Sequence, residues 1–255
     1  MPPKNHTTTV TEVAPDLFRL STFVPAFGLQ FNQFLVRDEE PLLFHTGMRG
    51  LFPAVQAAVA EVLDPKTIRW LAFSHYEADE CGALDDWLQL APSAQAACGA
   101  LGAMVNLSDM TQRPARGLAH DEVLTTGRFR FRYRATPHVP HGWDAGMLFE
   151  ETTRALFCSD LFFHGGEVEA VTRDDLVARY GTALTEAKGS PLDFSVPYTD
   201  QTRPILEATA ALAPAILLPM HGSAWLGDGQ RAVLQMADML EEVLRPNTQA
   251  AGKLA

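Results

Sequence analysis

The sequence has few cysteines, no long apolar run and no excess of basic residues. It contains only three cysteines among 255 residues, and none forms a CxxC pair. A disulfide framework is therefore not expected, and a reducing compartment fits better. No run of about 18 apolar residues is present to cross a membrane, and the first ten residues lack the apolar core of a signal peptide. We expect a cytoplasmic protein that does not bind a membrane.

A surplus of positive charge is also missing. The formal net charge is −11, whereas binding the backbone of a nucleic acid needs clustered lysine and arginine. Nucleic acid is therefore not an expected partner. The simplest interpretation of the acidic balance is a solvated surface that keeps the protein soluble.

What the sequence does contain is a series of short strands with interspersed helices. Strands are expected over residues 8–13, 17–20, 31–36, 41–44, 68–73, 94–98, 129–136, 147–150, 155–159 and 215–219. Helices are expected over residues 51–63, 82–90, 101–106, 173–188, 201–212 and 230–244. Residues 74–80 are expected to form a loop. This order suits two sheets packed face to face with helices outside.

The strongest local signal is an acidic loop with one histidine. His75, Glu77, Asp79 and Glu80 lie within six residues, directly after the apolar segment 68–73. In a loop at a strand end, alternate side chains can turn toward one point. Carboxylates that lie close together repel one another unless a positive charge lies between them. The segment therefore indicates a metal site, and its alternative interpretation is a solvated acidic turn.

Three further segments place polar residues directly after a predicted strand. They contain His138 with His141, then Asp160, then His221. A single aspartate or histidine at such a position is usually a cap or a surface residue. Four such segments in one chain are harder to explain in that way, because strand ends deliver side chains from a rigid scaffold to a common rim.

In this order, the residues resemble the metallo-β-lactamase superfamily. Most hydrolases of that superfamily carry HxHxDH, whereas this sequence reads HYEADE from His75 to Glu80. Glutamate at the second ligand place resembles the diiron branch, which comprises the flavodiiron proteins and the oxygen-binding diiron proteins. The segments TPHVPHGWDAGM (136–147) and PMHGSAW (219–225) are similar to that branch as well. The resemblance runs from about residue 10 to about residue 244.

The resemblance implies a fold and a domain organisation. The fold is α/β (α+β): a four-layer αβ/βα sandwich of two mixed β-sheets flanked by helices, which is the metallo-β-lactamase fold. Residues 1–255 are expected to form a single domain of this type. Flavodiiron proteins carry an additional FMN-binding flavodoxin domain, and this sequence has no flavodoxin-like segment.

The resemblance also implies two metal ions with seven candidate ligands. The ligands of the first ion are expected to be His75, Glu77, His141 and Asp160. The ligands of the second ion are expected to be Asp79, Asp160, His221 and Glu80, with Asp160 as the bridge.

Glu80 is the main departure from the family pattern, which usually has histidine at this place. Three roles stay open for it: to bind the second ion, to hydrogen-bond to a water on that ion, or to point away. Beyond the metal ligands, the candidate catalytic residues are Glu80, His138 and Tyr198. Asp144 is a candidate partner for the second ring nitrogen of His141, with a turn cap as the alternative. His45 is assigned a structural role.

The ligand chemistry favours iron. Zinc hydrolase sites favour imidazole or thiolate, and Glu77 replaces an imidazole with a hard, anionic oxygen donor that suits iron or manganese. We therefore expect two iron ions, with zinc or manganese as alternatives, and no FMN in this sequence.

Three functions remain open at this stage. The first is a non-heme diiron protein that binds or reduces dioxygen or nitric oxide, either with electrons from a separate donor protein or as an oxygen sensor. The second is a dinuclear zinc or manganese hydrolase of the same fold, in which two metals hold the attacking hydroxide. The third is a binding module with one metal or none. A homo-oligomer is a further candidate assembly.

Overall fold

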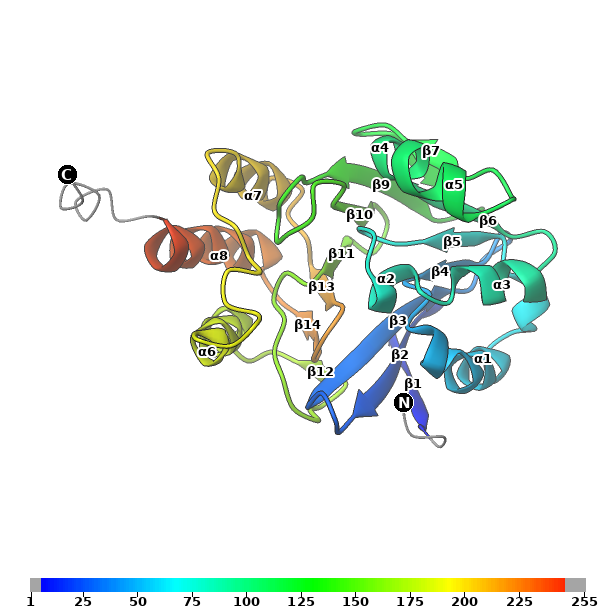
Figure 1. The fold of residues 1–255 in the computed structure, drawn as a ribbon, viewed down its shortest axis with the longest axis horizontal. Coiled ribbons are helices and arrows are strands. Elements are labelled where there is room, and N and C mark those ends of the chain that lie inside the picture. The colour runs from blue at the N-terminus through cyan, green and yellow to red at the C-terminus, as the bar shows by residue number, and fades with distance from the viewer. Residues whose placement is uncertain (1–5, 246–255) are drawn as a thin grey trace.

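Two seven-stranded sheets lie against each other in the computed structural model, with helices on both outer faces (Figure 1). The structure describes residues 6–245. The order of layers is helices, sheet, sheet, helices. This is the four-layer sandwich of two mixed sheets that the sequence predicts.

The first sheet is built from the N-terminal part of the chain. Its strands, in spatial order, are β1 (Thr8–Ala14), β2 (Leu17–Val24), β3 (Leu29–Val36), β4 (Leu42–Phe44), β5 (Trp70–Ala72), β6 (Gln95–Gly99) and β7 (Arg116–Leu118). The first four strands are antiparallel, and β4 to β7 are parallel. The parallel strands therefore deliver their C-terminal ends to one edge of the sheet.

The second sheet is built from the C-terminal part. Its strands, in spatial order, are β12 (Val171–Thr172), β14 (Ala224–Leu226), β13 (Ile216–Pro219), β11 (Ala155–Ser159), β10 (Gly146–Glu150), β9 (Arg130–Ala135) and β8 (Val123–Thr125). Strands β11 and β13 are parallel neighbours in its centre. The loops that follow these two strands therefore begin side by side.

Helices and helical turns cover the outer faces of both sheets. In the N-terminal half they are η1 (Arg49–Leu51), α1 (Phe52–Ala60), η2 (Pro65–Thr67), α2 (Ala78–Cys81), α3 (Leu84–Leu90), α4 (Ala100–Gly102), the π-helical turn η3 (Ala103–Leu107) and α5 (Ser108–Met110). In the C-terminal half they are α6 (Leu176–Ala187), α7 (Thr202–Ala210) and α8 (Gly229–Leu244). The carboxylates of Asp175 and Asp228 cap α6 and α8 by accepting backbone N–H groups, as aspartate commonly does at a helix start. None of the helices within residues 6–245 is long and apolar enough to span a bilayer.

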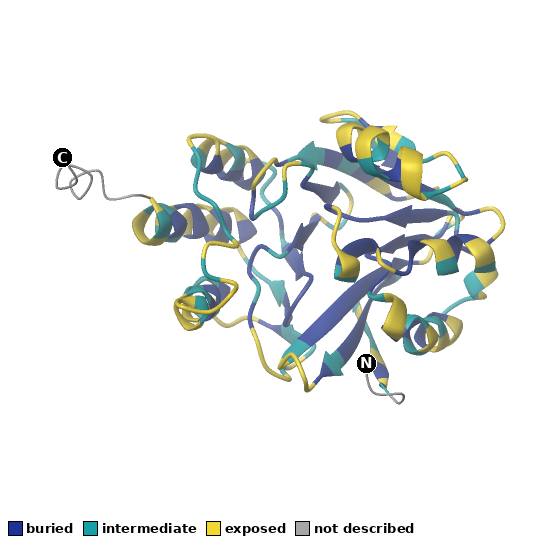
Figure 2. Cartoon of the chain, viewed as in Figure 1, coloured by how far each residue is buried: buried dark blue, intermediate teal, exposed yellow. Residues whose placement is uncertain are grey.

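Apolar side chains fill three interfaces between the four layers, and exposed residues lie mainly on the outer helices and loops (Figure 2). In the interface between the two sheets, the ring of Phe157 lies 5.7 Å from that of Phe34 and 5.1 Å from that of Phe44, measured between centroids. Each of these rings is fully buried, and burying one contributes roughly 1.5–3 kcal/mol. This interface fixes the two sheets relative to each other and so fixes the strand ends that carry the polar loops.

The structure confirms the ten predicted strands and the positions of the predicted helices, with small shifts at their ends. Four strands of two or three residues are absent from the sequence-based prediction: β7, β8, β12 and β14. They are too short to produce a readable periodicity. The loop predicted over residues 74–80 is wrong in its second half, because helix α2 begins at Ala78.

Candidate metal centre

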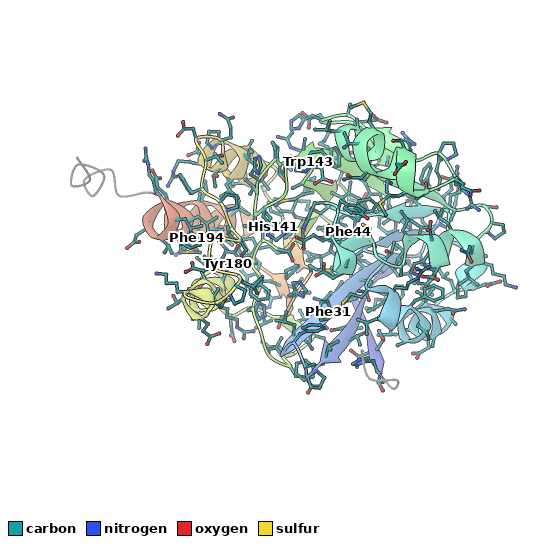
Figure 3. All side chains as sticks on the ribbon, in the orientation of Figure 1. Phe31, Phe44, His141, Trp143, Tyr180 and Phe194 are labelled. Atoms are coloured by element: carbon teal, nitrogen blue, oxygen red, sulfur yellow. The ribbon has the colours of Figure 1, made fainter. Side chains whose placement is uncertain are left out.

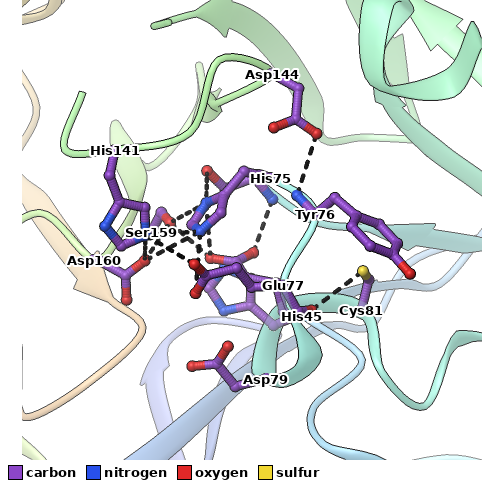
Figure 4. A network of polar contacts seen from close by, with 12 residues as sticks. His45, His75, Tyr76, Glu77, Asp79, Cys81, His141, Asp144, Ser159 and Asp160 are labelled. Carbon is purple, nitrogen blue, oxygen red and sulfur yellow. Dashed lines mark hydrogen bonds and ion pairs between the residues drawn. The ribbon is translucent and has the colours of Figure 1, made fainter. Parts of the chain in front are cut away.

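Six of the predicted ligands meet where the loops of the two sheets come together. Figure 4 shows five of them: His75, Glu77, Asp79, His141 and Asp160. His75, Glu77 and Asp79 follow β5 of the first sheet, whereas His141, Asp160 and His221 follow β9, β11 and β13 of the second. Figure 3 shows His141 near the middle of the molecule, between the half that carries Phe44 and the half that carries Tyr180. The site therefore lies between the two sheets and takes side chains from both.

The first group of donors surrounds His75. Its Nε2 lies 2.9 Å from Nε2 of His141, 3.6 Å from Oε2 of Glu77 and 3.7 Å from Oδ2 of Asp160. Nε2 of His141 lies 3.3 Å from the same Asp160 oxygen and 3.8 Å from Oε1 of Glu77. One donor atom each from His75, His141 and Asp160 falls within 4.8 Å of the others. Two imidazole nitrogens and two carboxylates thus converge on one small volume.

The second group of donors surrounds His221. Its Nε2 lies 3.3 Å from Oδ2 of Asp79 and 3.2 Å from Oδ1 of Asp160. Asp160 therefore presents one carboxylate oxygen to each group. Rings of Phe31 and Phe163 stand edge-on to His221, with centroids 5.0 and 5.4 Å away. These rings shield the imidazole from water on the sides away from the carboxylates.

The electrostatics of the site favour positive charge. Burial by itself would lower the pKa of His75, but the carboxylates of Glu80, Glu77 and Asp160 raise it to about 10. Burial is likewise outweighed at His221, where Asp160 and Asp79 raise the pKa to about 10. Asp160 shows the converse: burial would raise its pKa, but His141 and His221 hold that pKa well below the usual range. A cation bound at the site would replace the protons that these imidazoles attract.

Two glycines let the ligand loops approach closely. Gly142 has a φ of 82°, and a Cβ at this position would lie 3.2 Å from Cβ of His75. Gly222 has a φ of 94°, and a Cβ there would lie 2.3 Å from the ring of His164. Only glycine adopts such backbone angles at no steric cost. The loops that carry His141 and His221 thus depend on the glycine that follows each of them.

Strand β3 of the first sheet holds the His221 loop in place through hydrogen bonds. The carbonyl of Gln30 lies 2.8 Å from Nδ1 of His221, so the other ring nitrogen is directed toward Asp79 and Asp160. The Asn32 amide donates to the carbonyls of Pro219 and Gly222 at 2.9 and 2.8 Å. The orientation of His221 is therefore set by hydrogen bonds between the two sheets.

Glu80 is the one predicted ligand that the structure places outside both groups. Its side chain is fully buried behind His75, on the Nδ1 side of the ring, where Oε1 lies 3.7 Å from that nitrogen. Helix α2 explains the separation, because successive residues of a helix point about 100° apart. Asp79 faces His221, so Glu80 faces away from the ligand groups. Of the three roles left open by the sequence, the structure favours the one in which Glu80 points away.

Three other sequence-based assignments can be compared with the geometry. His138 is exposed, and its backbone N–H donates to Gly142 within the loop. Tyr198 is partly buried and packs against the apolar layer between the second sheet and its helices. Asp144 does not pair with His141; it accepts hydrogen bonds from the backbone N–H of Tyr76 at 3.2 Å and from Asn106 at 3.1 Å. Asp144 thus holds the acidic loop, a role different from the two that the sequence left open for it.

Sequence reasoning does not assign a role at the site to three residues around Glu80: Ser74, Ser159 and His45. They form the buried surroundings of its carboxylate. His45 follows a strand and Ser159 ends one, which is the signal that points to the candidate ligands. A serine is not a preferred ligand, and His45 has no carboxylate or second histidine within four residues of it, so neither residue stands out in the sequence.

Comparison with known proteins identifies relatives of the whole site region. A family model described as "ODP family beta lactamase" matches residues 29–222, well over half of the chain. Rubredoxin-oxygen oxidoreductase of Megalodesulfovibrio gigas is 26% identical over 207 residues, which cover 80% of this chain and 51% of that protein. The chain thus spans about half the length of this curated relative.

Solved structures agree with the fold. A mutant flavo di-iron protein of Thermotoga maritima superposes with a TM-score of 0.74 at 18% identity, over 91% of this chain and 61% of that one. The apo chemotaxis sensor ODP of T. denticola superposes with a TM-score of 0.68 at 18% identity, over 90% of this chain and 92% of that one. At these identities the likeness establishes the metallo-β-lactamase-type fold.

Proposed function

This chain belongs to the ODP beta-lactamase family, and from that membership and its donor geometry we propose that it holds two iron ions and binds or reduces dioxygen or nitric oxide. Its relatives include a rubredoxin-oxygen oxidoreductase, a flavo di-iron protein and a chemotaxis sensor. The chain shares with them the fold in which the six donor side chains gather.

The position of Asp160 is the main observation that supports two ions. Its Oδ2 faces His75 and His141, and its Oδ1 faces His221. A carboxylate that presents one oxygen to each of two donor groups can bridge two cations. The first ion would have four protein ligands, His75, Glu77, His141 and Asp160. The second would have three, namely Asp79, Asp160 and His221, because Glu80 is directed elsewhere.

The donor set fits iron. It combines three imidazoles with three carboxylates and no thiolate, which is the mixture of nitrogen and hard oxygen donors that iron accepts. When bound, two ferrous ions would supply electrons jointly to one diatomic ligand. The protein contributes the aromatic rings of Phe31 and Phe163, which limit the access of water to His221.

Reduction of the ligand would need an external source of electrons. We propose a separate electron-donor protein as partner when the site turns over. Without such a donor, the same site would act as a sensor of the diatomic ligand.

The direct test is metal analysis of protein that was purified without air, followed by absorption spectra on exposure to oxygen or nitric oxide. We expect two iron ions per chain and a change in near-ultraviolet or visible absorption when the gas is added. Stoichiometric zinc with hydrolytic activity, and no spectral response to either gas, would reject the proposal in favour of the hydrolase alternative.

A further inference from the structure

A buried carboxylate stands behind the candidate metal centre with its two oxygens fully engaged. Glu80 has no exposed surface. Its Oε2 accepts the backbone N–H of Ser74 at 2.9 Å and lies 3.1 Å from Nε2 of His45. Its Oε1 accepts the hydroxyl of Ser159 at 2.6 Å. These contacts, rather than a metal ion, satisfy the carboxylate.

The same contacts reach the inner nitrogen of His75. Its Nδ1 lies 3.2 Å from the hydroxyl oxygen of Ser74 and 3.4 Å from that of Ser159. The Ser159 hydroxyl donates its hydrogen to Oε1 of Glu80 at 2.6 Å. The lone pairs of the Ser159 oxygen are then available to accept a hydrogen bond from the Nδ1–H group of His75. The resulting order of donation runs from His75 to Ser159 to Glu80.

This order selects one tautomer of His75. With its proton on Nδ1, the lone pair of Nε2 points into the group formed by His141, Glu77 and Asp160. That is the form of histidine that can bind a metal through Nε2. Partners of this kind orient a ligand ring and raise its basicity, and their loss typically lowers metal affinity roughly 10- to 100-fold.

His45 holds Glu80 from the opposite side. Its Nδ1 lies 3.2 Å from the carbonyl of Asn32, which can only accept, so Nδ1 carries a hydrogen. Its Nε2 faces Glu80, whose Oε2 lies 3.1 Å away. The ring of His45 also packs on Phe44, with centroids 4.3 Å apart. His45 is fully buried and therefore has little freedom to move away from Glu80.

Backbone geometry supports a specific role for these contacts. His45 has a φ of 64° and Ser159 a φ of 53°, angles that are uncommon for residues other than glycine. Such angles persist when the surrounding structure enforces them, and they gather at functional sites. Here they occur in two of the three residues whose side chains contact or face Glu80.

We propose that Glu80 is a positioning residue rather than a metal ligand: together with His45, and through Ser159, it fixes the tautomer and the orientation of His75. This inference rests on the proposed metal centre. It assigns a buried pair of contacting side chains, Glu80 and His45, to the support of the first ion, whose proposed ligands include His75.

The test compares three single variants with the parent protein. Glu80→Gln replaces the carboxylate with an amide at nearly constant shape. Ser159→Ala removes the hydroxyl that lies between Glu80 and Nδ1 of His75 and leaves the Ser74 hydroxyl as the remaining neighbour of that nitrogen. Glu150→Gln is the matched control, because Glu150 is also buried and accepts the backbone N–H groups of Thr152 and Thr153 at 2.8 and 2.6 Å. It lies at the end of β10 and makes no contact with the ligand groups.

Affinity for Fe(II) or Zn(II) is measured by competition with a chelator under anaerobic conditions. We expect Glu80→Gln and Ser159→Ala to weaken binding of one ion roughly 10- to 100-fold and to leave the other ion and the Glu150→Gln control at parent affinity. Long-range ¹H–¹⁵N NMR of the zinc-loaded parent should place the His75 proton on Nδ1, and this signal should weaken or vanish in Ser159→Ala.

The outcomes separate the two proposals. A parent protein that binds no metal rejects the proposed function. A parent that binds two ions, with both variants at parent affinity and with the His75 proton unchanged, overturns the positioning role alone. If Glu80→Gln does not fold, Ser159→Ala decides: parent affinity in the folded variant overturns the proposal, and weakened affinity supports it.

Discussion

Metal binding should expel protons from this site. At pH 7, groups with a pKa of about 10, such as His75 and His221, carry a proton in all but about one molecule in a thousand. Burial would lower the pKa of His141, but its hydrogen bond to Asp160 raises that pKa above the usual value. Each imidazole must lose its proton before it can bind a cation through Nε2. Two protons from His75 and His221, and part or all of a third from His141, should therefore leave when both ions bind.

Isothermal titration calorimetry in buffers of different ionisation enthalpy measures this number directly. The overall association constant for both ions should rise two to three powers of ten per pH unit near pH 7. It should level off above about pH 10, where the imidazoles are already neutral. Asp160 stays ionised throughout and adds no proton. Release of fewer than one proton per fully loaded chain would refute the account of the electrostatics given above.

Three further outcomes follow from the geometry. His75→Ala and Asp160→Ala should each lose at least one metal ion by elemental analysis, and full metal content in either would contradict the ligand assignment. Gly222→Ala should lower the free energy of unfolding by about 1–3 kcal/mol in chemical denaturation, because a methyl group would meet the His164 ring at a φ of 94°. In α6, a methyl group at Gly181 meets nothing within 4 Å, so Gly181→Ala should raise the free energy of unfolding by about 0.5–1 kcal/mol. Equal stability of Gly222→Ala and Gly181→Ala would contradict the steric argument. In metal-free protein, the raised imidazole pKa values stabilise the fold fully below about pH 6.5, and this contribution is lost as pH rises to about 10. If the melting temperature of chelator-treated protein rose between pH 6.5 and pH 10, the predicted direction of this pH dependence would be wrong.

The sequence predicts that these side chains come together because each candidate ligand follows a strand. An apolar segment that stops at a histidine or an aspartate is readable without coordinates, and this signal identifies His141, Asp160 and His221. The layered fold can be predicted for the same reason, since strands long enough to alternate or to form a buried run leave a clear pattern.

The role of Glu80 cannot be read from the same pattern. Residue spacing alone does not show that a helix begins at Ala78. Because Asp79 and Glu80 are successive residues of this helix, their side chains point in different directions. The partners of Glu80 are equally hidden, because His45 reaches it through a left-handed backbone angle and Ser159 through a side-chain hydroxyl. The sequence leaves two roles open for Asp144, a partner of His141 or a turn cap. Its hydrogen bonds instead come from Tyr76 and Asn106, which only the tertiary fold brings close to it.

The division of the ligands between the two sheets has a consequence for the integrity of the molecule. His75, Glu77 and Asp79 belong to the N-terminal half, and His141, Asp160 and His221 belong to the C-terminal half. Neither half by itself offers a complete set of donors for either cation. An ion bound here would cross-link the two sheets. Separating the halves would then require breaking metal–ligand bonds as well as disrupting the aromatic packing between the sheets.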